Sequence, residues 1–242
     1  MEIRGHCDER FTAVRDAFEA NFLADEELGA SAAVTVEGQY VVDLWAGKRN
    51  HNGDPWEKET IVNVYSTTKT MASICILMLA DRGVIDFEAP VADYWPEFAR
   101  NGKDSVLVRH VMTHQTGCSG FPRPVTPEEL YDHDLMADLL AGMEPWWEPG
   151  TAPGYHAITQ GTLQAELMRR IDGRTLGTFF RDEVTAPLGA DFHIGLPLSE
   201  GHRVAQLDVP QEGIDQIVES DPDSIAARTF RSCRLDGTET ET

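Results

Sequence analysis

Two short apolar segments joined by a tight turn constrain the fold more than any other feature of this sequence. Residues 29–47 predict two strands with a turn at Glu37-Gly38-Gln39. An isolated two-stranded hairpin is marginally stable, so these strands need further partners or a covering layer. Residues 9–23 place Phe11, Val14, Phe18 and Phe22 on one helical face. We therefore predict an amphipathic helix that covers the sheet, and an α+β fold.

Residues 66–82 predict a buried helix. Its apolar residues recur at helical spacing with few charges; they are Met71, Ile74, Cys75, Met78 and Leu79. A serine at the start of the stretch suits a helix N-cap, and Asp81-Arg82-Gly83 provides the stop. From about residue 87 to 180 the pattern is helical and rich in loops, and the clearest helices are expected at 127–142 and 157–172.

The start of the 66–82 helix carries the pattern Ser66-Thr67-Thr68-Lys69. A serine hydroxyl is a weak nucleophile at neutral pH and needs a neighbouring group to take its proton. Position i+3 of a helix places the Lys69 amine on the same face as Ser66. We expect Lys69 to be largely desolvated, which favours the neutral amine that a general base requires. The pattern is short, however, and the alternative is a simple N-cap serine beside a solvated lysine.

Further segments accompany this pattern in a characteristic order: LADRGVID (79–86), PVADYWPEF (90–98), VRHVMTHQTG (108–117), WEPGT (147–151), PLG (187–189) and GLP (195–197). Together with Ser66 and Lys69 they resemble the serine β-lactamase-related hydrolases. The chain is most similar to the branch of class C β-lactamases and β-lactamase-like carboxylesterases, from about residue 10 to about residue 235. The resemblance implies a β-lactamase/transpeptidase-like fold, with an antiparallel sheet flanked by helices and an all-helical region.

The second catalytic motif of that family, Y-x-N, corresponds here to Tyr155-His156-Ala157. The resemblance implies that Tyr155 lies near Ser66 and Lys69 and moves the proton between nucleophile and leaving group. A half-buried packing tyrosine is the alternative. Ala157 departs from the family's asparagine, which helps hold the side-chain amide of a β-lactam. This departure favours an esterase over an antibiotic hydrolase.

The third family motif, K-T-G, H-x-G or W-G-G on a downstream strand, has no counterpart after residue 198. In the family, the two strands of residues 29–47 pair with three more strands from the C-terminal third. Here only residues 203–207 are a plausible strand, and residues 208–242 are acidic with little apolar periodicity. We therefore expect an incomplete sheet and a chain that is either a fragment of a longer hydrolase or a gene product cut short. The predicted division is 1–86 for the sheet domain with the Ser66 helix, 87–195 for the helical region, and 196–242 for an acidic, truncated return to the sheet.

Charge and cysteine content limit the partners. The net charge of −21 argues against nucleic acid and anionic membranes, and no stretch is long enough to span a bilayer. The N-terminal residues lack the apolar core of a signal peptide. The four cysteines are far apart and are expected to be free thiols in a reducing compartment. We therefore expect a cytoplasmic protein.

Other candidate sites are weaker. Gly117-Cys118-Ser119-Gly120-Phe121 falls one residue short of a nucleophile elbow, and Cys118 in this loop could be exposed. His110 and His114 lack a third metal ligand, so they more plausibly satisfy backbone groups. His156 could tune the site or line it. Trp146 and Trp147 are expected to aim the Tyr155 loop, and the alternative is that one of them forms a wall of the acyl pocket. We expect no metal and, without a Gly-rich phosphate loop, no cofactor.

The sequence thus predicts an acyl-serine hydrolase of small carboxylic esters, with Ser66 as nucleophile, Lys69 as base and Tyr155 as proton shuttle. One alternative is an amide hydrolase such as a β-lactamase or a D-amino-acid peptidase. Another is a non-catalytic remnant that binds acyl ligands. The acyl and alcohol specificity and the oligomeric state are not determined by the sequence.

Overall fold

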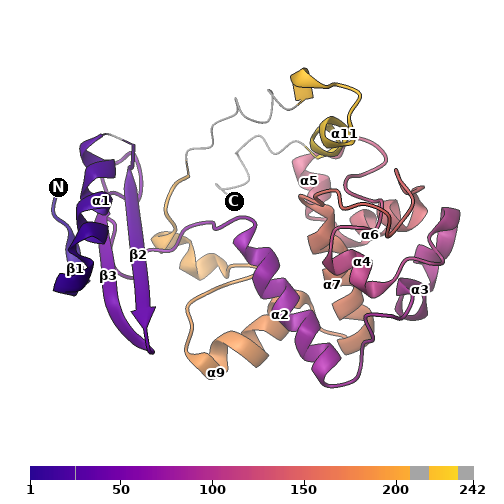
Figure 1. The fold of residues 1–242 in the computed structure, drawn as a ribbon, viewed down its shortest axis with the longest axis horizontal. Coiled ribbons are helices and arrows are strands. Elements are labelled where there is room, and N and C mark those ends of the chain that lie inside the picture. The colour runs from indigo at the N-terminus through magenta and orange to yellow at the C-terminus, as the bar shows by residue number, and fades with distance from the viewer. Residues whose placement is uncertain (25, 208–217, 234–242) are drawn as a thin grey trace. The chain divides into compact units, whose positions relative to one another are not determined.

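The computed structural model describes residues 1–24, 26–207 and 218–233, which fall into two compact units (Figure 1). Among these residues, the first unit contains 1–63 and 196–207, and the second contains 64–195 and 218–233. The domain boundaries expected at residues 86 and 195 stay a prediction about the whole protein. Within the described ranges, no helix combines the length and apolarity needed to cross a bilayer.

The first unit contains an antiparallel sheet of three strands in the order β1-β3-β2: β1 (Arg4–Cys7), β2 (Gly29–Val36) and β3 (Gln39–Gly47). The predicted hairpin is confirmed, with Val36 opposite Gln39. Its turn places Glu37 and Gly38 at φ 51° and 76°. Positive φ at both central residues gives the twist that joins antiparallel strands tightly.

Strand β1 was not predicted, because four residues without apolar alternation give too weak a signal. It pairs with β3, Arg4 opposite Trp45 and Cys7 opposite Val42. Gly5 explains how so short a strand fits. It has φ +101°, and a Cβ atom there would lie 1.9 Å from the carbonyl oxygen of Asp43. Only glycine allows the two backbones to approach this closely.

The predicted amphipathic helix is also confirmed. Helix α1 (Thr12–Leu23) follows a 3₁₀ turn, η1 (Glu9–Phe11), and buries Phe18. Phe18 belongs to one apolar cluster with Val41, Val42, Leu44 and Ala46 of β3, against which Phe11, Val14 and Phe22 also pack. The helix therefore supplies the covering layer that the sheet requires.

The second unit is built around α2 (Thr67–Asp81), against which α7 (Thr159–Asp172) and α8 (Leu176–Phe180) pack. Helix α2 ends as predicted, with Gly83 at φ +70°. The apolar residues of these helices merge into one core. Shorter elements surround it: α3 (Val91–Tyr94), η2 (Pro96–Gly102), α4 (Val108–Met112), η3 (Arg181–Thr185) and α9 (Ala186–Leu188).

The helix expected at 127–142 is interrupted. It consists of α5 (Pro127–Leu130) and α6 (His133–Gly142). The carboxylate of Asp132 accepts a hydrogen bond from the backbone N–H of Leu135 at 3.0 Å. An aspartate in this role caps a new helix, so the chain restarts there rather than continuing from α5.

Helix α7 carries a buried carboxylate that its sequence pattern does not reveal. The side chain of Glu166 is 1% exposed and accepts hydrogen bonds from Arg169, Arg170 and His133 at 2.7–3.0 Å. Burial alone would raise the pKa of Glu166, but these three partners outweigh it and hold that pKa at about 2. The ionised Glu166 thus fixes the start of α6, through His133, against α7.

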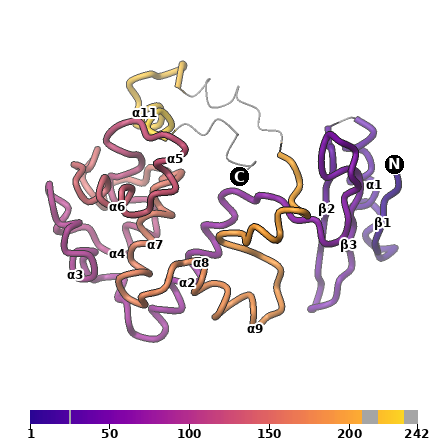
Figure 2. Tube along the Cα trace, turned by 180° about the vertical axis from the view of Figure 1, so that it is seen from behind, coloured from indigo at the N-terminus to yellow at the C-terminus, as the bar shows by residue number. Residues whose placement is uncertain are grey.

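The segment after residue 197 differs from prediction. It begins with η4 (Leu198–Arg203), and the strand expected at 203–207 is reduced to a single bridge between Val204 and Ile61. In the second unit, α11 (Ile225–Ser232) lies beside α5 in both views (Figures 1 and 2), and a bridge joins Cys233 to Val125 just before α5. Within 198–207 and 218–233 the chain forms no strand. The rest of the acidic segment, 208–217 and 234–242, lies outside the described residues.

Candidate functional site

The three residues predicted to carry the chemistry meet at the start of α2. Ser66 Oγ accepts a hydrogen bond from Lys69 Nζ at 3.1 Å and another from the Tyr155 hydroxyl at 2.7 Å. Ser66 is the N-cap residue of α2, but its side chain makes no capping bond. Its hydroxyl is therefore directed to Lys69 and Tyr155 rather than to the helix backbone.

The backbone around Ser66 also has features of a reactive site. Tyr65, which precedes it, has φ 44°, a conformation that costs a bulky residue energy and that recurs at active sites as well as in turns. Among the described residues, the backbone N–H of Ser66 has no hydrogen-bond partner. This N–H is therefore available as one donor to a developing oxyanion.

Lys69 connects the helix to the Tyr155 loop. Besides Ser66, its amine donates to the carbonyl oxygen of Ala157 at 2.6 Å, and it lies 5.2 Å from the centroid of the Tyr155 ring. The side chain is half-buried, so the expected desolvation is only partial. The contact uses the backbone of residue 157, so alanine in place of asparagine does not remove it.

Tyr155 lies on a loop between α6 and α7, and 51% of the residue is exposed. Trp147 Nε1 donates to the carbonyl oxygen of Ala152 at 2.8 Å. The same indole lies over Gly154, where a Cβ atom would be 2.5 Å from the ring. Trp147 therefore shapes the loop before Tyr155, as predicted. Trp146 instead lies under the guanidinium of Arg228, 4.1 Å from its ring centroid.

His156, which follows Tyr155, is fully buried beneath the loop. Its Nδ1–H donates to the carbonyl oxygen of Gly154 at 2.5 Å, so its Nε2 accepts from the hydroxyl of Thr116 at 2.6 Å. Burial lowers the pKa of His156 to about 4, although the bond to Gly154 opposes this shift and His114 adds to it. The ring supports the loop as a neutral group and does not line an open site.

The low pKa of His156 predicts a loss of stability in acid. Well above pH 6.5 the imidazole is neutral in both the folded and the unfolded chain, and its contribution to stability is complete. As the pH falls from 6.5 to about 4, the unfolded chain binds a proton that the folded chain does not, so the free energy of unfolding should fall by up to ~3 kcal/mol. Urea unfolding of the wild type and of His156→Gln at pH 7, 5.5 and 4.5 measures this. The variant should lose less stability across this range, and an identical pH slope in both proteins would contradict the prediction.

The remaining candidates from the sequence have structural roles. His110 Nδ1 accepts from the backbone N–H of Leu107 at 3.2 Å at the start of α4, as predicted for a backbone-satisfying histidine. The expectation that Cys118 could be exposed is wrong, since it is fully buried. Ser119, the serine of the elbow-like segment, is buried and bonded to Thr229 at 2.7 Å. Among the described residues, no cluster of three or more His, Cys, Asp or Glu side chains could hold a metal ion.

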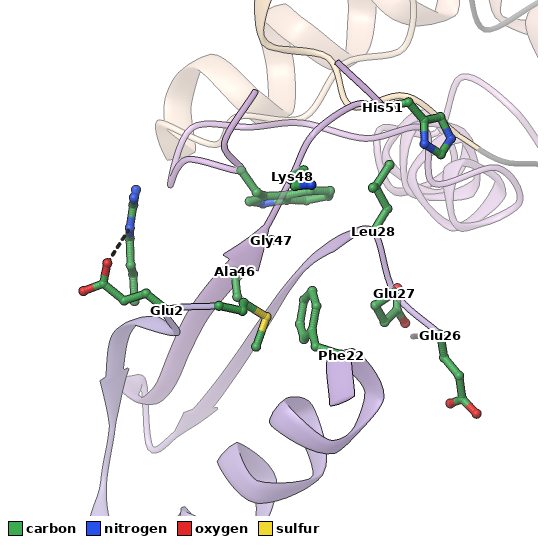
Figure 3. Close-up of a pocket in the computed structure, with 12 residues that line it drawn as sticks. Glu2, Phe22, Glu26, Glu27, Leu28, Ala46, Gly47, Lys48 and His51 are labelled. Carbon is green, nitrogen blue, oxygen red and sulfur yellow. Dashed lines mark ion pairs between the residues drawn. The ribbon is translucent and has the colours of Figure 1, made fainter. Parts of the chain in front are cut away.

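The first unit contains an open cavity of about 610 Å³ (Figure 3). It is lined by apolar side chains such as Phe22 and Trp56 and by charged ones such as Glu26, Glu27 and Lys48. None of Ser66, Lys69 and Tyr155 lines it, so this cavity is not part of the site at the start of α2.

The chain is similar to several known proteins. A family model described as Beta-lactamase matches residues 15–226. Esterase/beta-lactamase LipL of Mycobacterium tuberculosis is 42% identical over 211 residues, which are 86% of this chain and 49% of that protein. Esterase EstB of Burkholderia gladioli is 30% identical over 180 residues, 67% of this chain and 45% of that protein. The solved structure of a family VIII carboxylesterase has a TM-score of 0.83 at 44% identity and covers 98% of this chain and 67% of its own. The chain thus spans about half the length of these curated relatives.

Proposed function

The chain belongs to the beta-lactamase family, and on that premise we propose that it is an acyl-serine hydrolase that cleaves small carboxylic esters through a Ser66 acyl-enzyme. The observation that carries this proposal is the position of Ser66 Oγ, 3.1 Å from the Lys69 amine and 2.7 Å from the Tyr155 hydroxyl. Both distances allow direct proton transfer. Curated relatives named esterases add support.

The proposed reaction has two steps. In the first, Lys69 in its neutral form takes the Ser66 proton while Oγ attacks the ester carbonyl. The tetrahedral intermediate then collapses, the bond to the alcohol breaks, and the alcohol leaves with a proton that Tyr155 delivers and Lys69 replaces. In the second step, water attacks the carbonyl of acyl-Ser66. Lys69 and Tyr155 take a proton from this water and return one to Ser66 Oγ as the acyl bond breaks. The carboxylic acid leaves and Ser66 regains its proton.

The oxyanion of the intermediate needs donors, and the Ser66 N–H supplies one. The family draws a second from the strand of its third motif, for which the sequence shows no counterpart. A missing donor costs roughly 3 to 4 kcal/mol in acyl transfer. We therefore expect slow ester turnover by this chain and measurable reaction with a strong electrophile.

The residue at position 157 favours esters over lactams as substrates. The Ala157 side chain carries no polar group to bind the amide of a lactam side chain, whereas its backbone carbonyl still holds Lys69. A relative named both esterase and beta-lactamase keeps the amide reaction open as a second substrate class for the same site.

The test is intact-mass labelling of the purified chain with a fluorophosphonate, followed by peptide mapping. We expect one adduct, on Ser66. Turnover of a short-chain ester and of nitrocefin is then compared, and ester turnover should exceed nitrocefin turnover. Nitrocefin turnover rivalling that of the ester would instead favour the amide hydrolase. Ligand binding without any adduct would support the non-catalytic alternative and overturn the proposal.

We also propose a cytoplasmic location and no nucleic-acid or membrane partner. The support is the net charge of −21 and the absence of any disulfide between the cysteines of the described chain. Fractionation of the producing cell with an antibody against the chain tests the location.

A further inference from the structure

One residue outside the predicted site holds the backbone on both sides of Tyr155. The carbonyl oxygen of His114 accepts a hydrogen bond from the N–H of Gly154 at 2.9 Å. Its imidazole Nδ1 accepts another from the N–H of His156 at 3.1 Å. The bonded N–H groups belong to the residues immediately before and after Tyr155, so a single residue holds the backbone on both sides of the shuttle residue.

The rings of His114 and Tyr155 also pack against each other. Their centroids lie 5.0 Å apart with an interplanar angle of 52°, and the centroid of the His156 ring lies 5.5 Å from that of the His114 ring. Since the Tyr155 hydroxyl is 2.7 Å from Ser66 Oγ, the His114 contacts constrain the base of the side chain whose tip reaches the nucleophile.

The conformation of His114 makes this double contact possible. Its φ is 62°, in the left-handed region that histidine, asparagine and aspartate occupy more readily than other non-glycine residues. This conformation is held at a cost, and such strained residues cluster where function requires them. Here it turns both the carbonyl and the imidazole of one residue toward the Tyr155 loop.

We propose that His114 is the positioning residue of Tyr155: its carbonyl oxygen and the unprotonated Nδ1 of its imidazole fix the phenol at hydrogen-bond distance from Ser66. The inference rests on the proposed function, because positioning matters only if Tyr155 moves protons. Acceptance at Nδ1 requires the tautomer with hydrogen on Nε2. Burial lowers the pKa of His114, and the positive charge that Lys69 carries whenever it is protonated lowers it further, so both favour the neutral ring.

Three variants separate the acceptor from the backbone conformation. His114→Gly keeps the left-handed backbone without strain but removes the acceptor. His114→Asn tolerates the same φ and offers Oδ1 close to the place of Nδ1. His193→Gly is the matched control, because it removes an imidazole and its 3.0 Å contact with Asp191 in the same unit without touching Tyr155.

The expected results follow from small displacements of the phenol. His114→Gly should lower the rate of Ser66 labelling by roughly 10- to 100-fold, through kcat rather than KM where ester turnover is measured. His114→Asn should recover most of that loss, and His193→Gly should label as the wild type does. A His114→Gly rate within twofold of wild type would overturn the proposal. Failure of His114→Asn to recover any of the loss would also overturn it, because the imidazole rather than its acceptor would then be needed.

Two further readouts do not depend on activity. Hydrogen exchange of the His156 amide should be faster in His114→Gly and return toward the wild-type rate in His114→Asn. The ¹⁵N shifts of the His114 ring should show an unprotonated Nδ1. If the wild type gives no adduct on Ser66, the proposed function fails while these measurements still test the two hydrogen bonds. Unchanged exchange in His114→Gly, or hydrogen on Nδ1, refutes the positioning role itself.

Discussion

Ser66→Ala should reduce ester cleavage by roughly 10³- to 10⁶-fold, the range expected when a covalent nucleophile is removed. The loss is large because Lys69 and Tyr155 both act through the Ser66 hydroxyl, to which they lie at 3.1 and 2.7 Å. Groups that act as a unit lose most of their effect when one is removed. The measurement is initial-rate hydrolysis of a short-chain p-nitrophenyl ester, together with intact-mass labelling.

A change in the stability of the fold should not explain the loss of ester cleavage in Ser66→Ala. Ser66 makes no capping hydrogen bond, so alanine at the N-cap removes no contact with the α2 backbone. Thr70→Ala is the matched control, since it removes an exposed hydroxyl from the next turn of the same helix. It should leave the rate within about twofold, as expected of a surface change. Turnover in Ser66→Ala at a tenth of the wild-type rate or more would show that another group is the nucleophile.

The second large effect is expected at Lys69. Lys69→Met keeps the length of the side chain and removes the amine, and a lost general base lowers the rate by roughly 10²- to 10⁴-fold. Lys69→Arg keeps the positive charge but cannot become a neutral base, because a guanidinium does not deprotonate in proteins. If Lys69 acts as a base, both variants should be equally poor in ester turnover and in labelling.

The Lys69→Met variant also loses the hydrogen bond to the carbonyl oxygen of Ala157. This loss should cost about 1 kcal/mol of unfolding free energy, which urea unfolding measures separately from the rate. Lys58→Met, at an exposed lysine of the first unit, is the control for removal of an ammonium. A Lys69→Arg enzyme with near wild-type turnover would contradict the base assignment and point to charge stabilisation alone.

Local signals in the sequence were sufficient to predict those helices and strands whose stabilising contacts are between residues close together in the chain. The hairpin was predictable because Glu37-Gly38 suits a turn with positive φ, and α1 because Phe18 recurs with its neighbours on one helical face. The start of α2 was predictable for the same reason, since Ser66 and Lys69 are one turn apart in any helix that begins there. Strand β1 was missed because its stability comes from pairing with β3 and from the close approach at Gly5.

The place of Tyr155 came from a resemblance to a family and not from any pattern in the chain itself. Tyr155 and Ser66 are 89 residues apart, and no periodicity links them. The buried carboxylate of Glu166 was unpredictable on similar grounds, because a charged residue on a helix is usually solvated. It is buried here only because His133 of another helix and two arginines of its own meet it there.

By itself, the sequence determined that Ser66 and Lys69 share one face of a helix, that a hairpin lies at residues 29–47, and that a helix covers it. Those features depend on backbone conformation and on periodicity, which a few consecutive residues specify. The tertiary structure alone decided that Tyr155 reaches Ser66 and that His114 encloses it with two hydrogen bonds. These contacts join segments about 40 to 90 residues apart. The packing of α7 against α2 and α4 brings these segments within hydrogen-bond distance.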